Sequence, residues 1–172
     1  SAASDVYKRQ FGYRTEEKVR IGVADDEAFC FFYADNLNLL EQMGAELVRF
    51  SPIHDRELPE DLDGLLLSGG YPELNGEALE ENQEMCTRIR EVILDGMPCL
   101  AECGGFMYLH EEMEDERHIV WEMAGVLNGR TYPAGKLVRF GYVELSHEKE
   151  QKESCYLKQG EVIKGHEFHY WD

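Results

Sequence analysis

The sequence predicts an α/β protein built on an open, mostly parallel sheet flanked by helices. Three observations indicate this class. Apolar strand-like runs alternate with longer amphipathic segments, glycine or proline separates them, and the run from Gly64 to Ser68 is apolar on both faces. Such a strand is typical of the interior of a parallel sheet, where helices cover each face. We therefore expect functional loops at the carboxyl ends of the strands.

The chain predicts its elements in the order β-α-β-β-α-β-α. Val19 to Ala24 is the first strand, and an amphipathic helix follows from about Tyr33 to Met43, where Gly44 ends it. The second strand runs from Glu46 to Phe50, and the third is the apolar run at Gly64 to Ser68. This order is typical of an open sheet whose faces are both covered.

The segment from Gly76 to Leu94 is predicted to be the second helix, because its apolar residues lie near one face and its acids and arginines on the other. Gly96 and Pro98 break this pattern before a fourth strand. Apolar helix formers after Cys103 predict a third helix. The fourth strand and the third helix therefore meet at a cysteine.

The chain changes character after about Glu111, where acidic and turn residues make the pattern irregular. Two strand-like runs, Leu137 to Leu145 and Glu161 to Tyr170, are expected to pair antiparallel near the end. At the other end, residues 1–18 are polar and aperiodic, and we interpret them as a tag or linker. The domain is therefore assigned to residues 19–172.

The charge of the chain argues against two classes of partner. Its 172 residues include 35 acidic and 17 basic ones, a formal net charge of -18, so nucleic acid and anionic membrane surfaces would be repelled. The sequence shows neither a membrane-spanning apolar stretch nor the pattern of a signal peptide. Its five cysteines lack paired C-x-x-C spacing, against a disulfide framework or a structural zinc site. We expect a cytoplasmic protein with reduced thiols.

Cys103 is the strongest candidate for a catalytic residue. A short apolar run precedes it and Gly104-Gly105 follows it, a pattern that predicts strand, tight turn and helix. A side chain at such an elbow projects clear of the sheet, and the following backbone N–H groups open toward it. The start of a helix favours thiolate over thiol, so we expect a lowered pKa and a nucleophile. The alternative is a buried core cysteine.

A second candidate is the loop from Ser68 to Glu73, which follows the third strand. Gly69 and Gly70 let the backbone approach a substrate closely and turn an N–H toward a developing oxyanion. The alternative is a simple turn, because glycine pairs commonly follow strands without any catalytic role.

A third candidate lies near the end of the last predicted strand. Alternation along a strand puts Glu167 and His169 on one face and His166 and Phe168 on the other. The imidazole and the carboxylate could then supply a base for a thiol and an acid to orient that base. The alternative is a histidine with no catalytic role. No metal site is expected, because the spacing is one residue short of H-E-x-x-H and the segment is a strand.

Four motifs then occur in a characteristic order. They are Gly-Gly-Tyr-Pro-Glu at 69–73, Ala-Glu-Cys-Gly-Gly-Phe-Met-Tyr-Leu at 101–109, Phe-Gly-Tyr-Val-Glu at 140–144 and Gly-His-Glu-Phe-His-Tyr at 165–170. From about Val19 to Trp171 the chain resembles the glutamine amidotransferase domain of the cobyrinic acid a,c-diamide synthase family, class I glutaminases with a flavodoxin-like fold and a nucleophile elbow. The resemblance implies that Cys103 attacks the side-chain amide of glutamine and that His169 is the general base and acid.

The resemblance also implies roles for the two other loops. The backbone N–H groups of Gly70 and Gly104 would stabilise the tetrahedral intermediate, and Gly69, Tyr71 and Glu73 would help to bind the substrate. The ammonia would pass to a synthetase domain of the same polypeptide, which uses ATP and magnesium to amidate the a and c carboxylates of a tetrapyrrole acid. No cofactor is expected in the present domain, because the sequence contains no G-x-x-x-x-G-K-[ST] loop.

Two departures from the family pattern keep alternatives open. Many class I glutaminases carry an orienting glutamate two residues after the histidine, where this chain has Trp171. Glu167 is therefore the candidate acid, and a dyad of Cys103 and His169 is the alternative. Both flanks of the related synthase are absent, so we expect a fragment. Other interpretations are a synthetase for a different tetrapyrrole such as a nickel-containing one, a non-catalytic module, or another thiol-elbow cysteine hydrolase.

Overall fold

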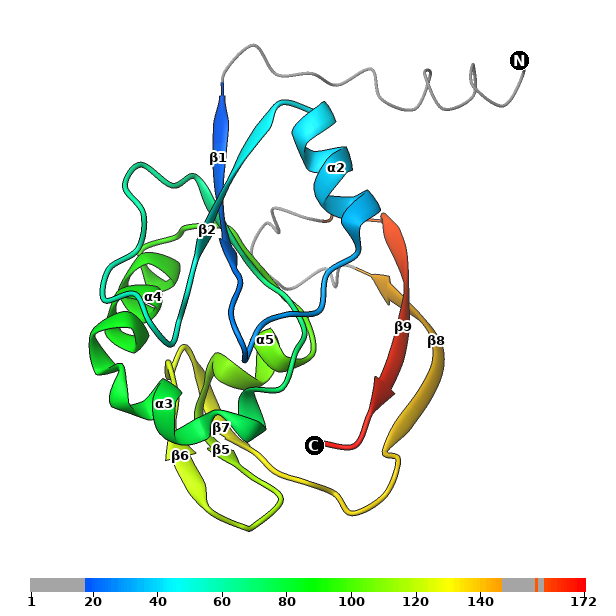
Figure 1. Cartoon of the computed structure of the whole chain (residues 1–172). Coiled ribbons are helices and arrows are strands. Elements are labelled where there is room, and N and C mark those ends of the chain that lie inside the picture. The colour runs from blue at the N-terminus through cyan, green and yellow to red at the C-terminus, as the bar shows by residue number, and fades with distance from the viewer. Residues whose placement is uncertain (1–17, 147–156, 158–159) are drawn as a thin grey trace.

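A parallel sheet forms the main body of the protein. The computed structural model of the chain describes residues 18–146, 157 and 160–172 (Figure 1). The sheet contains β1 (Val19–Ala24), β2 (Ala45–Phe50), β3 (Gly64–Leu67) and β4 (Cys99–Ala101). Its neighbouring strands are all parallel, in the order β2-β1-β3-β4. The predicted α/β class with a mostly parallel sheet is confirmed.

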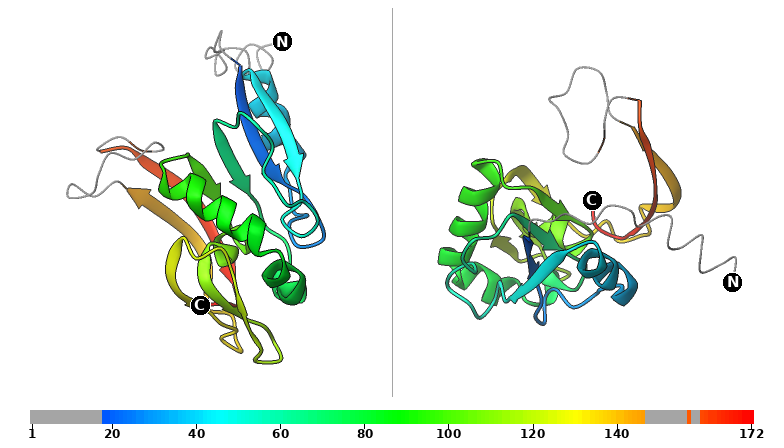
Figure 2. Two further views of the ribbon diagram at one scale, coloured as in Figure 1. Left: turned by 90° about the vertical axis from the view of Figure 1, so that its left-hand side faces the viewer. Right: turned by 90° about the horizontal axis from the view of Figure 1, so that it is seen from above.

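Helices cover both faces of this sheet. α2 (Ala34–Gln42) connects β1 to β2, and α3 (Gly76–Glu81) and α4 (Gln83–Leu94) lie between β3 and β4. The connection from β1 to β2 and the one from β3 to β4 run in opposite directions along the sheet. Because such crossovers are right-handed, α2 and α4 lie on opposite faces, as Figures 1 and 2 show. The short α5 (Gly104–Tyr108) follows β4. Every predicted helix of this half is present.

The segment predicted as one helix from Gly76 to Leu94 is divided at Asn82. The backbone of Asn82 leaves the helical region, with φ −91° and ψ 59°. Its side-chain oxygen accepts the N–H of Met85 at 3.4 Å, and its amide donates to the carbonyls of Pro52 at 2.8 Å and Asp55 at 2.7 Å. The buried amide therefore caps α4 and ties it to the loop after β2.

The core lies between the sheet and the helices that follow β3 and β4. Its largest fully buried side chains include those of Tyr108, Phe29, Leu67, Leu79, Met85 and Ile89. Tyr108 of α5 contacts Phe29 edge to face, with ring centroids 5.3 Å apart, and its hydroxyl lies 3.3 Å from the sulfur of Cys86. These contacts hold α5, and with it the turn that precedes α5, against the sheet.

A second sheet follows α5, which the sequence analysis did not predict. β5 (His110–Glu114) pairs antiparallel with β6 (Val120–Glu122) and parallel with β7 (Leu127–Thr131). These strands are short and rich in polar residues, so they show little of the apolar alternation by which strands are recognised. The irregular sequence pattern after Glu111 therefore did not predict this sheet.

The last two strands form the predicted antiparallel hairpin. β8 (Arg139–Ser146) pairs with β9 (Val162–His169), and Arg139 lies opposite His169. Figures 1 and 2 show the hairpin as a curved ribbon at one side of the body, with the C-terminus at its base. A two-stranded ribbon has little stability of its own, so its position depends on how its base is attached.

One face of the hairpin carries exposed aromatic side chains. Phe140 contacts His166 and Phe168 edge to face, with ring centroids 5.6 and 5.9 Å apart. Tyr142, which is 91% exposed, contacts the same His166 at 5.3 Å. Exposure alternates along β9, so the half-buried His169 lies on the opposite face, as predicted.

The tag or linker predicted at 1–18 lies outside the described part of the chain, except for Lys18. Among the described helices, none combines the length and the apolar character that crossing a membrane would need.

Candidate active site

Cys103 occupies the predicted elbow between a strand and a helix. It follows β4 by one residue and immediately precedes α5, and its thiol-bearing side chain is exposed rather than packed in the core. Its backbone has φ 50° and ψ −115°, a conformation that is strained for a residue with a Cβ atom. Because α5 has only five residues, few aligned peptide dipoles act on the thiol.

Two glycines allow the loops around Cys103 to touch. A Cβ atom on Gly70 would lie 2.0 Å from the carbonyl oxygen of Ala28, and one on Gly104 would lie 2.7 Å from Cδ of Pro72. No side chain fits at either position without moving backbone or a proline ring. The same Cβ position on Gly104 is 3.2 Å from the backbone nitrogen of Gly70. The loop after β3 and the start of α5 are therefore in direct contact.

These two glycines carry backbone N–H groups that are available to a ligand. The neighbouring groups are engaged, because the N–H of Tyr71 donates to the carbonyl of Ala28 at 2.9 Å and that of Gly105 to Ser68 at 3.1 Å. Within the described part of the chain, no acceptor pairs with the N–H of Gly70 or Gly104. Two free N–H groups beside a thiol are what an oxyanion hole requires.

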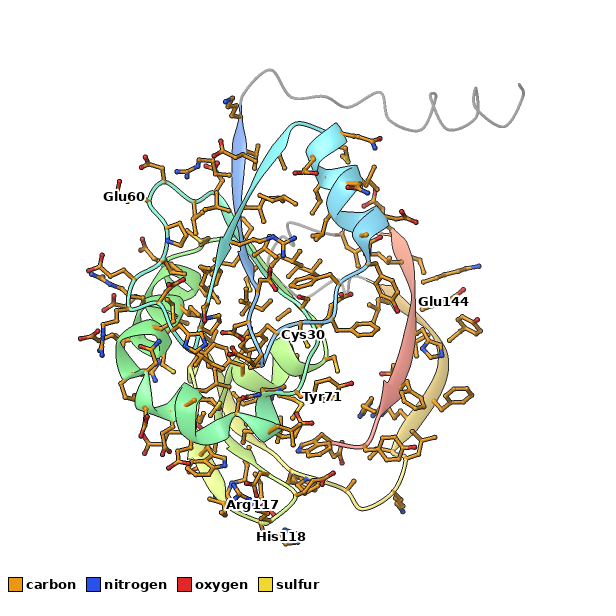
Figure 3. All side chains as sticks on the ribbon, viewed as in Figure 1. Cys30, Glu60, Tyr71, Arg117, His118 and Glu144 are labelled. Atoms are coloured by element: carbon orange, nitrogen blue, oxygen red, sulfur yellow. The ribbon has the colours of Figure 1, made fainter. Side chains whose placement is uncertain are left out.

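A third loop reaches the thiol, and the sequence analysis missed it. The N–H of Phe31, in the loop after β1, donates to the carbonyl of Gly69 at 3.0 Å. A Cβ atom on Gly69 would lie 3.6 Å from Cβ of Phe31 and 3.5 Å from Cβ of Cys103. Figure 3 labels Cys30 and Tyr71 on these two adjoining loops. Gly69 thus lies between the loop after β1 and the elbow at Cys103.

Aromatic side chains on these two loops form what we call the aromatic rim, defined as Phe31, Tyr33 and Tyr71. All three are more than half exposed, and the rings of Phe31 and Tyr33 meet edge to face at 5.5 Å. One signal could have identified this loop from the sequence. Strands on either side of β1 make its carboxyl end the switch point of the sheet, where ligands bind in open α/β proteins.

Glu73 places a carboxyl group on the loop after β3. It lies in a single 3-10 turn, Pro72–Leu74, which packs against α5. Burial raises the pKa of Glu73 above its ordinary value, and the nearby carboxylate of Glu116 adds to the shift, while a backbone hydrogen bond opposes it. The half-buried carboxyl therefore lies on a turn that packs against α5, in a place where a bound cation would relieve its desolvation.

His169 ends β9 and points one ring nitrogen at the backbone. Its Nδ1 lies 2.6 Å from the carbonyl oxygen of Trp171. Glu167 has a different neighbour, because its Oε1 lies 3.7 Å from Nη1 of Arg139 on β8. No described hydrogen bond joins Glu167 to His169. The role of Glu167 as the orienting acid stays a prediction, and the geometry gives His169 a carbonyl partner instead.

The structure brings some predicted site residues together and leaves others on a separate element. The loop after β3 and the elbow meet directly and carry Gly69, Gly70, Tyr71, Glu73, Cys103 and Gly104. His169 and Glu167 lie on the hairpin, and no hydrogen bond among the described residues joins them to Cys103. Catalytic hydrogen bonds are commonly long before substrate binds, so this separation does not remove His169 as a base.

The other cysteines and the possible metal ligands do not form a second site of this kind in the described part of the chain. Burial raises the pKa of Cys99 to about 11 and also raises that of Cys86, whereas Cys30 is exposed. Cys155 lies outside the described residues. In the described part of the chain, no group of three or more His, Cys, Asp or Glu side chains is placed to hold a metal ion.

Comparison with known proteins gives a consistent result. Residues 20–171 match the model of the CobB/CobQ-like glutamine amidotransferase domain. The cobyrinate a,c-diamide synthase of Caldanaerobacter subterraneus subsp. tengcongensis is 46% identical over 155 residues, which cover 90% of this chain and 34% of that protein. Those of Salmonella typhimurium and Syntrophotalea carbinolica are 43% and 47% identical over 152 residues, 88% of this chain and 32% of each. The chain spans about a third of the length of these relatives.

Proposed function

The chain belongs to the family of CobB/CobQ-like glutamine amidotransferase domains, and from this premise we propose that it hydrolyses glutamine, with Cys103 as the nucleophile. The observation that carries the proposal is the elbow itself. An exposed thiol on a strained backbone lies beside two N–H groups that have no acceptor in the described part of the chain. A structural cysteine would instead be buried in the core, and its backbone would have no reason to be strained.

The first half of the reaction releases ammonia. The sulfur of Cys103 attacks the side-chain amide carbon of glutamine, and the N–H groups of Gly70 and Gly104 stabilise the oxyanion that forms on the amide oxygen. His169 takes the thiol proton and gives it to the leaving nitrogen as the C–N bond breaks. The products of this half are ammonia and a thioester between Cys103 and the glutamyl group.

The second half restores the enzyme. His169 removes a proton from water, whose oxygen attacks the thioester carbon. The C–S bond then breaks to release glutamate, and His169 returns the proton to the sulfur, which restores the free thiol and the neutral imidazole. The aromatic rim lies on the two loops that adjoin the elbow, where its exposed rings would contact a bound glutamine.

Glu73 is proposed to bind the α-ammonium group of glutamine. It lies two residues beyond Tyr71 of the rim, on the 3-10 turn that packs against α5. The carboxylate of Glu116, which acts on its pKa, adds negative potential in the same region. A cationic group bound there would be favoured, and free glutamine would be distinguished from a glutamine residue inside a peptide.

The ammonia is proposed to serve the amidation of a tetrapyrrole acid. The relatives are cobyrinate a,c-diamide synthases, and about two thirds of their length lies outside the match. That remainder would hold the ATP and magnesium sites and activate the a and c carboxylates, whereas this domain would bind glutamine and need no cofactor. The alternative, a non-catalytic module, would have the same fold but would not hydrolyse glutamine, so labelling of the thiol by a glutamine analogue separates the two functions.

Covalent labelling with 6-diazo-5-oxo-L-norleucine, read by peptide mass spectrometry on this chain, tests the proposal. We expect one modified cysteine, Cys103, and protection of that cysteine by glutamine. Cys30 is the internal control because it is the other exposed thiol among the described residues. The variant Cys30→Ser should be labelled like the unchanged protein, and Cys103→Ser should not be labelled.

Two outcomes would contradict the proposal. Equal modification of Cys30 and Cys103 without glutamine protection would indicate general thiol reactivity rather than a substrate site. The second outcome is that the reagent labels neither this chain nor a full-length synthase that contains it. That result would exclude the glutaminase function and favour the non-catalytic module.

A further inference from the structure

We propose that Trp171 is a positioning residue for His169, an inference that rests on the proposed glutaminase function. Its backbone carbonyl fixes the position of the proton on the imidazole, and its indole ring anchors that carbonyl to the second sheet. In this arrangement a main-chain oxygen takes the place of the acid that orients histidine in a catalytic triad. Neither Glu167 nor any other carboxylate is needed for that task.

The hydrogen bond determines which ring nitrogen acts as the base. Nδ1 of His169 lies 2.6 Å from the carbonyl oxygen of Trp171. A carbonyl oxygen can only accept, so Nδ1 must carry the hydrogen and donate it. In the neutral ring the lone pair is then on Nε2, which is free to accept a proton from a thiol or from water. The contact therefore selects one tautomer.

The pairing of the last residues explains why this carbonyl is available. The N–H groups of Tyr132 and Asp172 each donate to the carbonyl of the other residue at 2.9 Å. The neighbouring pair in this antiparallel ribbon is Pro133 with Trp171. Residues at such a position direct their carbonyls away from the partner strand, and Pro133 has no N–H to offer. The carbonyl of Trp171 is thus left for the imidazole.

The indole of Trp171 holds this segment in place. Its Nε1 donates to the carbonyl oxygen of Glu114, the last residue of β5, at 3.0 Å. The ring is half-buried and packs against the hydrophobic core. The base of the hairpin is therefore attached to the second sheet through the same residue whose carbonyl orients His169. Loss of the indole N–H would release the carbonyl from its fixed position.

The environment of Glu167 supports this assignment. Its carboxylate lies on the same face of β9 as His169, but its described partner is Arg139 across the hairpin, at 3.7 Å. A carboxylate that is paired with an arginine in this way stabilises the hairpin rather than the imidazole. Among the described residues, the hydrogen-bond partner of the His169 ring is the carbonyl of Trp171.

The test combines histidine NMR with glutamine hydrolysis. The six histidines of the full chain are labelled with nitrogen-15, and His169 is assigned by comparison with His169→Gln. We expect the neutral ring of His169 to be in the Nδ1–H tautomer, and Trp171→Phe to shift it toward a mixture with the Nε2–H tautomer. The kcat of Trp171→Phe should fall about tenfold while KM changes less than about twofold, because the base is misplaced rather than the substrate.

Trp121→Phe is the matched control, because the indole of Trp121 also donates a hydrogen bond in the second sheet, to Oδ2 of Asp115 at 3.3 Å. It should leave both the tautomer and kcat unchanged. An Nε2–H tautomer in the unchanged protein would overturn the proposal, and so would an unaltered tautomer and kcat in a folded Trp171→Phe. If Trp171→Phe does not fold, the tautomer of the unchanged chain and the variant Trp171→Tyr decide instead. If neither this chain nor a full-length synthase that contains it hydrolyses glutamine, the proposed function is refuted, while the tautomer still decides the role of Trp171.

Discussion

The proposed nucleophile and the proposed base lie on parts of the molecule that are built very differently. Cys103 lies at an elbow where three loops touch, and the core residue Tyr108 fixes the helix behind it. His169 lies on a two-stranded ribbon with an exposed outer face, attached at its base through Trp171. Backbone packing therefore fixes the first half of the site, and a few hydrogen bonds fix the second. Substitutions should damage the two halves in different ways.

The largest effect is expected from Cys103→Ala, which removes the proposed nucleophile. Glutamine hydrolysis should fall by at least about a thousandfold, since no other thiol of the described residues is placed at the elbow. The fold should remain, because the side chain is exposed and fills little of the core. Release of glutamate and a thermal melt measure the two quantities. Activity within tenfold of the unchanged protein would exclude Cys103 as the nucleophile.

A glycine substitution in each half tests the difference in packing. Gly70→Ala places a Cβ 2.0 Å from a backbone oxygen and should destabilise the protein by more than about 3 kcal/mol, or prevent folding. Gly165→Ala on β9 meets only Cγ2 of Val143 at 3.4 Å, an ordinary contact, and should change stability by less than about 1 kcal/mol. Urea unfolding compares the variants. Equal losses would show that the ribbon is packed as tightly as the elbow.

Acidification should weaken glutamine binding through Glu73. Because burial raises the pKa of Glu73, its carboxylate is protonated at a higher pH than an ordinary glutamate, and the KM for glutamine should rise as the pH falls through that range. Glu73→Gln should show a high KM that no longer depends on pH there. Glu77→Gln, at an exposed position on α3, is the control and should retain the dependence of the unchanged protein. A KM of Glu73→Gln that still rises on acidification would assign the effect to another group.

The smallest effect is expected from Glu167→Gln. Its carboxylate pairs with Arg139 and has no described contact with the imidazole, so kcat should fall less than about threefold. His169→Ala provides the scale, because loss of the general base should cost about a hundredfold or more. Steady-state kinetics of both variants measures the ratio. Similar losses would make Glu167 the orienting acid and return the site to a triad.

The sequence predicted the elements whose determinants are local. β1 begins and ends at the predicted residues, and the elbow at Cys103 follows from a glycine pair directly after an apolar strand. The break at Asn82 could not be predicted, because its amide binds carbonyls about thirty residues away. The same limit applies to the hydrogen bond from Phe31 to the carbonyl of Gly69 and to the partner of His169. Both depend on main-chain groups, which the identity of a side chain does not reveal.

The strained backbone of Cys103 also has a consequence for laboratory evolution. Its φ of 50° and ψ of −115° suit glycine, so Cys103→Gly should relieve about 1–3 kcal/mol of strain. A library selected only for heat resistance would therefore enrich glycine at this position and would lose the thiol in the process. Thermostable descendants of this domain have to be selected for turnover and stability together.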